Sequence, residues 1–352
     1  MKQKIFFPKE PNFFFKETRT RVDEYLKYND YDKFGGRKLI GKYIVIKIIL
    51  ITFYSVIFFL ADSPFVFIPF LILGPLGIVL VINVSHDGIH GVASANKWLN
   101  NYFVMQMDLI GANSFVWKIK HKFGHHVFPN TLGKDPDLSQ SNLVRILPGT
   151  HLKWFHQFQK IYVPFLYAFY TINWIYIRDF FDFFSTKSQI QNIPKVAYMK
   201  FLVWKSIYIT IFLFIPFHFT SLSLEEVLFY NLLMHISASY FLTIALVPSH
   251  VSENSVFVQP NEKGEMPFSW SHHQVITTTD FAVENKFLTW LLGGFNHHVS
   301  HHLFPGVSHV HYRVITTIVK ETSKKYNLNY TEETSIFKAY LSHFNLLNNN
   351  GK

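Results

Sequence analysis

The stretch Pro64–His90, PFVFIPFLILGPLGIVLVINVSHDGIH, combines two features. Its first 21 residues, up to Val84, carry no charged side chain. As a helix they are long enough to cross the apolar core of a bilayer, which takes about 20 residues. The next turn holds His86 and His90, whose four-residue spacing places them on one face of the same helix. The stretch therefore predicts a membrane-spanning helix that ends in a pair of imidazoles.

Three other segments are also long and apolar enough to span a bilayer. They are Tyr43–Ala61, Phe201–Phe219 and Val227–Val251. Short connections join the first span to the second and the third to the fourth, so we expect two helical hairpins. Lys47 and Lys205 are expected to extend their ammonium groups to the lipid headgroups. We predict an all-α, polytopic membrane protein with four transmembrane helices and a His-rich cytoplasmic helical cap.

Basic residues set the predicted orientation. The first 47 residues carry 12 Lys and Arg, the stretch from His86 to Lys200 carries 12 more, and the two short connections carry none. Because basic loops stay on the cytoplasmic side, both termini and the cap are expected there. The predicted divisions are a cytoplasmic N-terminal segment (1–42), a membrane domain (43–320) whose cap comprises 86–200 and 252–320, and a C-terminal tail (321–352).

Composition narrows the classes of partner and site. The chain has 352 residues with 33 Lys and Arg against 23 Asp and Glu, a net charge of +10, and it lacks zinc-finger or RNP-like motifs. Membrane lipids, and not nucleic acid, are therefore the expected anionic partner. The absence of Cys excludes thiolate zinc sites, iron–sulfur clusters and Cys nucleophiles. Imidazole, with 19 His, is the abundant metal ligand that remains.

Three histidine clusters indicate a metal centre. They read HDGIH, HKFGHH and HVSHH, and each can direct two or three imidazoles at one point. Eight imidazoles exceed what one ion needs, so two neighbouring metal ions are the simplest interpretation. The eight are His86, His90, His121, His125, His126, His298, His301 and His302.

The segment Ile161–Ile177 complicates the number of spans. It is an uncharged run of 17 residues between Lys160 and Arg178, at the lower limit of spanning length. A fifth span would place the third histidine cluster on the opposite side of the membrane from the first two. We therefore expect an interfacial or a re-entrant helix, and the sequence leaves these two alternatives open.

Iron is the metal that these residues favour. The first cluster has Asp87 after its histidine, so the HExxH motif of zinc proteases and its general base are absent. Iron with nitrogen ligands and open positions suits O2 activation, and a site at the base of membrane helices suits a hydrocarbon substrate. Asp87, Asp135 and Asp137 are candidates to orient the imidazoles by accepting their second N–H, although helix or turn capping explains them equally well.

The motifs around these clusters resemble those of the integral-membrane fatty acid desaturases, in particular the linoleoyl-CoA-type and front-end acyl desaturases. They read NVSHDGIHGVASANKWLN, WKIKHKFGHHVFPNTLGKDPDL, WSHHQVITTTDF and WLLGGFNHHVSHHLFPGVSHVHY, and the resemblance runs from about Lys33 to Lys320. His298 stands where this subgroup usually has Gln. By position the resemblance implies His250 as a ninth ligand. His235, about 22 Å earlier along a helix, is interpreted as an interhelical hydrogen bonder.

The resemblance implies an oxidoreductase that uses O2 and two electrons at a di-iron centre to introduce a cis double bond into an acyl-CoA or acyl-lipid chain. No residue beyond the metal ligands is assigned a catalytic role. The first 42 residues lack the haem domain that many front-end desaturases carry, so a separate ferredoxin or cytochrome-type donor is expected. One alternative is a hydroxylase of the same superfamily. A membrane metal transporter is less favoured because the spans hold few polar groups. The double-bond position, chain length, acyl carrier, identity of the electron donor and oligomeric state are not predicted.

Overall fold

A computed structural model describes residues 4–9, 12–138, 142–147, 149–185, 188, 190 and 192–352. These residues are mostly helical, and they form two compact units. Unit 1 comprises Met1–Phe34, Lys120–Val163 and Ala245–Lys352, and unit 2 comprises Gly35–Ile119 and Pro164–Ile244.

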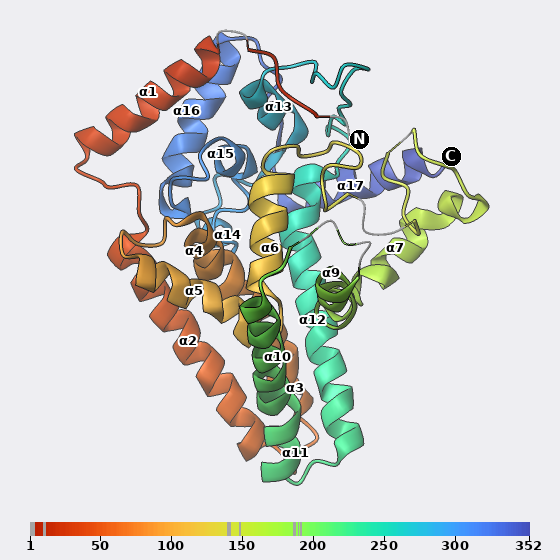
Figure 1. The fold of residues 1–352 in the computed structure, drawn as a ribbon. Helices are drawn as coiled ribbons and strands as arrows, with labels where there is room; N and C mark the ends of the chain where they lie inside the picture. Colours follow the sequence, from red (N-terminus) through yellow and green to blue (C-terminus); the bar gives the residue numbers. More distant parts are fainter. Residues whose placement is uncertain are drawn as a thin grey trace. The chain divides into compact units, whose positions relative to one another are not determined.

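Four helices among the described residues are long and apolar enough to cross a membrane. They are α2 (Gly36–Phe59), the continuous helix Phe67–His90, the continuous helix Lys195–Phe219 and α12 (Leu224–His250) (Figure 1). The predicted number of spans is thereby confirmed by length and composition. The helices are longer than predicted, because helical hydrogen bonding continues into polar flanking residues that hydropathy does not count. The histidine pair His86 and His90 is therefore the last turn of the second span.

Wide helical turns interrupt two of these helices. The second consists of α3 (Phe67–Leu80), the π-turn η1 (Val81–Ser85) and α4 (His86–His90). The third consists of α10 (Lys195–Ile209), the π-turn η5 (Thr210–Phe214) and α11 (Ile215–Phe219). A π-turn holds more residues than an α-turn, so it changes the direction of the side chains that follow. The turn η1 comes directly before His86.

Unit 2 packs its membrane helices closely. Helices α2 and α3 lie side by side, and Ile57 and Phe70 from these helices are fully buried in one cluster (Figure 1). A Cβ atom at Gly74 of α3 would lie 2.1 Å from the carbonyl oxygen of Met234 in α12. Only glycine permits this backbone approach, which is a common contact between membrane helices.

The segment that complicated the number of spans is broken into short helices. It is divided among α7 (Gln159–Tyr167), α8 (Tyr170–Ile172) and the π-turn η4 (Asn173–Arg178), and α9 (Asp179–Phe184) follows. The segment is not among the candidate spans in the part of the chain that the structure describes. A fifth span is therefore not supported, whereas the choice between an interfacial and a re-entrant segment stays open.

Lys205 is buried in unit 2, and the expectation that it reaches the headgroups is wrong. Its Nζ donates to Oδ2 of Asp179 over 2.8 Å and to the carbonyl oxygens of Gly111 and Ile175 over 2.6 Å each. Asp179 supplies a counter-charge from a segment 26 residues away, which hydropathy does not reveal. These bonds connect the segment before α6 (Ser114–Lys120) and the segment after α8 to α10.

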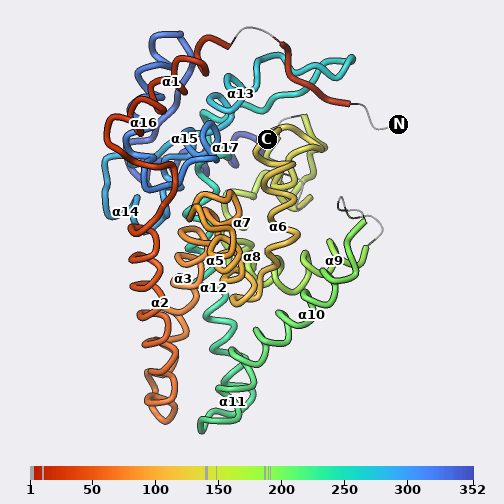
Figure 2. The backbone as a smooth tube through the Cα atoms, turned by 60° about the vertical axis from the view of Figure 1, so that its left-hand side comes forward, coloured from red at the N-terminus to blue at the C-terminus, as the bar shows by residue number. Residues whose placement is uncertain are grey.

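Unit 1 is built from shorter helices. Helices α1 (Phe13–Tyr28) and α16 (Tyr312–Lys325) lie side by side (Figure 2). Their shared core contains Phe14, Val22, Ile315 and Val319. The helices that lie wholly in unit 1 are α1 (Phe13–Tyr28), the π-turn η2 (His121–His125), the 3-10 helices η3 (Trp154–Phe158) and η6 (His309–His311), α13 (Trp270–Thr277), α14 (Lys286–Leu291), α15 (His298–Leu303), α16 (Tyr312–Lys325) and α17 (Ile336–Asn350).

Two short parallel strands tie the end of the chain into unit 1. Strand β1 (Asp280–Phe281) pairs with β2 (Glu332–Glu333), with Asp280 opposite Glu332. Leu347 in α17 is fully buried. The segment that was expected as a tail thus contributes a strand and a packed helix to the unit that carries the second and third histidine clusters.

Unit 2 holds α5 (Lys97–Leu109), and α6 (Ser114–Lys120) has residues in both units.

Candidate metal centre

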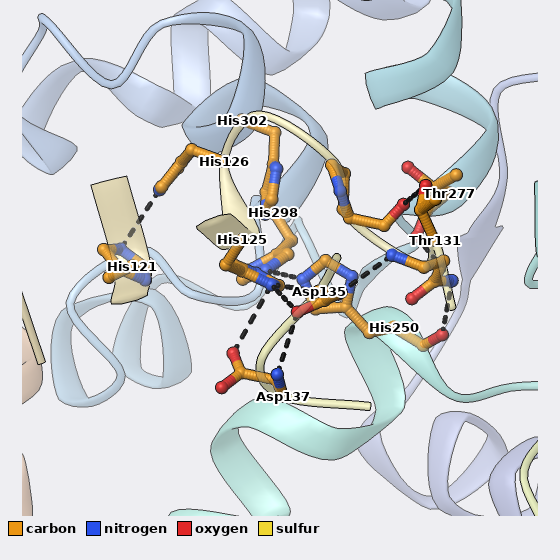
Figure 3. A network of polar contacts seen from close by, with 12 residues as sticks. His121, His125, His126, Thr131, Asp135, Asp137, His250, Thr277, His298 and His302 are labelled. Atoms are coloured by element: carbon orange, nitrogen blue, oxygen red, sulfur yellow. Dashed lines mark hydrogen bonds and ion pairs between the residues drawn. The ribbon is translucent and has the colours of Figure 1, made fainter. Parts of the chain in front are cut away.

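Four histidines from three distant segments converge in unit 1. Nitrogen atoms of His125, His250, His298 and His302 all lie within 4.8 Å of one another. Figure 3 shows these side chains gathered beside Asp135. They come from η2, the last residue of α12 and α15. The shortest distance, 2.7 Å, joins Nε2 of His250 to Nε2 of His298. The structure thus brings together three sequence motifs at one point.

Three further histidines form a second group in unit 1. Nitrogen atoms of His121, His126 and His301 lie within 4.8 Å of one another, and the Nε2 atoms of His121 and His126 are 3.0 Å apart. Two nitrogens that bind one ion at about 2.1 Å and at right angles lie roughly 3 Å apart. Both groups therefore have spacings that fit a metal ion.

The first histidine pair lies in unit 2. The ring centroids of His86 and His90 are 4.8 Å apart, and His86 is 2% exposed. The indole ring of Trp117 meets the His86 ring edge-on with a centroid distance of 5.9 Å. The four-residue spacing therefore brings the two rings together as predicted.

Hydrogen bonds at Nδ1 orient four of the rings. The pairs are His125 with Asp135 (3.1 Å), His298 with the carbonyl oxygen of Phe295 (3.2 Å), His301 with the hydroxyl of Tyr312 (3.1 Å) and His302 with Oε1 of Gln274 (2.9 Å). A ring held through Nδ1 offers Nε2 to a metal ion, as is usual for metal-binding histidines. The Nε2 of His302 is buried and has no hydrogen-bond partner among the described residues, which fits a metal ligand.

Asp135 and Asp137 both face His125, but their environments differ. Asp135 is buried and its Oδ2 accepts the backbone N–H of Asn130 over 2.9 Å, whereas the Asp137 side chain is 55% exposed. Burial disfavours a charged His125, yet Asp135 first and then Asp137 raise its pKa to about 9. Asp87, the third predicted carboxylate, is buried in α4.

His250 and His235 have different surroundings, although both belong to α12. His235 in unit 2 hydrogen-bonds the hydroxyl of Tyr208 over 2.8 Å and Oγ1 of Thr171 over 3.1 Å. His235 therefore makes interhelical hydrogen bonds, as predicted. His250 belongs to the four-histidine group instead.

Several residues that hold the histidines in place were not predicted from the sequence to have a role. Gln274 and Tyr312 bind His302 and His301, and Asn130 donates from Nδ2 to the carbonyl oxygen of His250 over 2.9 Å. Asn130 is buried, with a φ of 55°. All three stand inside the quoted motifs, so their position beside the histidine clusters was the available signal.

Comparison with known proteins decides the family. The chain matches the family described as fatty acid desaturase over residues 62–334. It belongs to this family. The resemblance noted in the sequence is confirmed, and the family supports an oxidoreductase that acts on acyl lipids.

Curated relatives of this desaturase cover most of the chain. It is 28% identical to an sn-1 linoleoyl-lipid 6-desaturase of Arthrospira platensis, over 95% of this chain and 91% of the relative. It is 29% identical to an acyl-lipid (8-3)-desaturase of Physcomitrium patens, over 94% and 70%. It is 30% identical to an acyl-lipid (8-3)-desaturase of Mortierella alpina, over 96% and 77%. The family and the four apolar helices indicate membrane association.

Proposed function

We propose that this desaturase converts a –CH2–CH2– unit of a lipid-bound acyl chain into a cis double bond. The reaction consumes O2, two electrons and two protons and yields two waters. The observation that carries the proposal is the group of His125, His250, His298 and His302, in which motifs far apart in sequence meet. The names of the curated relatives, which are acyl-lipid desaturases, support an acyl-lipid substrate.

Nine histidines are proposed to hold two iron ions, which supply the oxidising chemistry when bound. One ion would be held by His125, His250, His298 and His302. The remaining proposed ligands of the two ions are His121, His126 and His301 of unit 1 and the pair His86 and His90 of unit 2. Including the unit 2 pair rests on the spacing of the first motif and on the family. Because zinc has no redox chemistry, iron is the metal that suits an oxidation.

The protein's own residues have three tasks in this reaction. Asp135, Gln274 and Tyr312 fix the rings that they bind, so that each Nε2 keeps its direction. The apolar helices are proposed to bury the acyl chain and to exclude water from it.

The distribution of basic residues along the chain supports a cytoplasmic location for the site. We place both termini and the His-rich cap on the cytoplasmic side, because these parts of the chain carry most of the basic residues. The basic end of each predicted helical hairpin would lie on the same side. Electrons would come from a separate ferredoxin or cytochrome-type protein on that side.

Product analysis tests the proposed activity. The chain is expressed, with an electron donor, in a host whose lipids hold only saturated and monounsaturated chains, and fatty acids are identified by gas chromatography–mass spectrometry. Wild type and the control His151→Ala, an exposed histidine, are expected to form a new double bond, and His125→Ala none. A hydroxylated product would indicate a hydroxylase, and unchanged lipids beside stable protein would contradict both.

A further inference from the structure

Asp280 is a buried carboxylate that contacts α15, the helix that carries the third histidine cluster. It is 0% exposed, and each of its oxygens has a hydrogen-bond donor. Oδ1 accepts the backbone N–H of Val299 over 2.8 Å, and Oδ2 accepts the hydroxyl of Tyr330 over 2.8 Å. Val299 lies between His298 and the next two histidines of α15. Asp280 thus connects the start of α15 to Tyr330, which lies 50 residues after Asp280 in the chain.

The backbone around Asp280 is fixed on several sides. Its N–H donates over 3.1 Å to the carbonyl oxygen of Thr331, the residue before β2. The neighbouring N–H of Thr279 donates over 2.8 Å to the carbonyl oxygen of Ser249, the residue before His250. The segment that carries Asp280 therefore contacts the supports of two groups of histidines, and its carboxylate has little freedom to move.

Besides its hydrogen bonds, the negative charge of the Asp280 carboxylate matters for a metal centre. Two iron cations held by neutral imidazoles alone would leave their positive charge without compensation inside the protein, which is unfavourable. Among the described residues of unit 1, the buried acidic side chains are Asp135 and Asp280. Asp135 touches His125, and Asp280 touches the helix that carries His298, His301 and His302. Each side chain therefore offers one negative charge to the same centre.

We propose that Asp280, held by Tyr330, is a positioning residue that fixes α15 and supplies a buried negative charge to the metal centre. This inference rests on the proposed iron site. The negative charge favours the more oxidised, more positive iron, so it lowers the reduction potential of the centre.

The test uses the full-length protein, purified and loaded with iron. Asp280→Asn keeps the shape and an acceptor for the Val299 N–H but removes the charge. Tyr330→Phe keeps the charge but removes the hydroxyl. Thr279→Val is the matched control, since it removes a neighbouring hydroxyl whose hydrogen bond goes to Thr331 and not to α15. All potentials are measured at the same pH.

Two readouts separate charge from position. In a redox titration, Asp280→Asn is expected to shift the potential upward, with Tyr330→Phe and Thr279→Val close to wild type. In a chelator challenge, Tyr330→Phe is expected to lose iron several-fold faster than wild type and Thr279→Val.

Each failure has a distinct signature. If Asp280→Asn holds iron at the wild-type potential, the proposed charge is refuted. If Asp280→Asn does not fold, Tyr330→Phe decides the positioning, and iron release at the wild-type rate refutes it. Iron absent from the wild type would instead overturn the proposed function.

Discussion

Nδ1 of His125 lies 3.1 Å from Oδ1 of Asp135, and both side chains are buried (Figure 3). The carboxylate is itself fixed, because it accepts the backbone N–H groups of Asn130 and Asp137 over 2.9 Å each. A fixed acceptor at Nδ1 determines the direction of Nε2, the atom available to a metal. This contact therefore links the loop after η2 to the proposed iron site.

Replacement of Asp135 by Asn should weaken metal binding by about 10- to 100-fold, the usual cost of losing such an orienting partner. Co2+ titration of the metal-free protein, followed by absorbance, measures the affinity. Asp137→Asn is the control, because that side chain is 55% exposed and 3.4 Å from His125. Equal losses in the two variants would contradict an orienting role for Asp135.

His250 and His235 should differ in their effect on iron. His250→Ala is expected to lower the iron content, because this side chain lies in the four-histidine group. His235→Ala is expected to keep the iron and to lose stability, since it leaves the buried hydroxyl of Tyr208 without its 2.8 Å partner. Iron analysis and thermal unfolding in detergent measure the two effects. Iron loss from His235→Ala alone would reverse the assignment.

Removing Lys205 should destabilise unit 2 strongly. Lys205→Met leaves the carboxylate of Asp179 buried without its counter-charge, which costs about 3–5 kcal/mol in comparable pairs. The double variant Lys205→Met, Asp179→Leu removes both charges and should recover much of the loss. Thermal unfolding of the three proteins in one detergent tests this. A double variant no more stable than Lys205→Met would contradict the ion-pair explanation.

Stability should fall in mild acid through His343. Burial lowers its pKa to about 4, although the hydrogen bond to the carbonyl of Val251 opposes this shift. In the unfolded chain the pKa of His343 is 6.5, so between pH 4 and pH 6.5 the unfolded chain binds more protons than the folded protein. The contribution of neutral His343 to the free energy of unfolding is complete above pH 6.5 and is lost as the pH falls toward 4. At pH 5 the loss amounts to about 2 kcal/mol.

His343→Asn tests this dependence, because its amide can still donate to Val251. The melting temperatures of both proteins are compared at pH 7.5 and 5, and wild type should lose more. Other buried histidines affect both proteins alike, so equal losses would show that His343 does not titrate as expected.

Local patterns predicted the membrane helices and the histidine clusters. A span needs only consecutive apolar residues, and imidazoles such as His86 and His90 converge because helical spacing alone brings them together. The family motifs added His250, which local spacing does not mark. For these features the information lies within one turn or one segment of the chain.

Contacts between distant residues were not predicted. Lys205 and Asp179 are 26 residues apart, and Asp280 and Tyr330 are 50 apart. Neither pair follows a periodic pattern, so only the folded chain reveals it. The π-turn before His86 was also missed, because the same residues are compatible with a regular α-helix.

The metal content of the purified wild type is the most direct test of the proposed di-iron site. Inductively coupled plasma mass spectrometry on protein from iron-supplemented cells should find two iron ions per chain. His302→Ala and His126→Ala, one from each histidine group of unit 1, should each hold less. A wild type that holds no iron, or zinc in its place, would contradict the account.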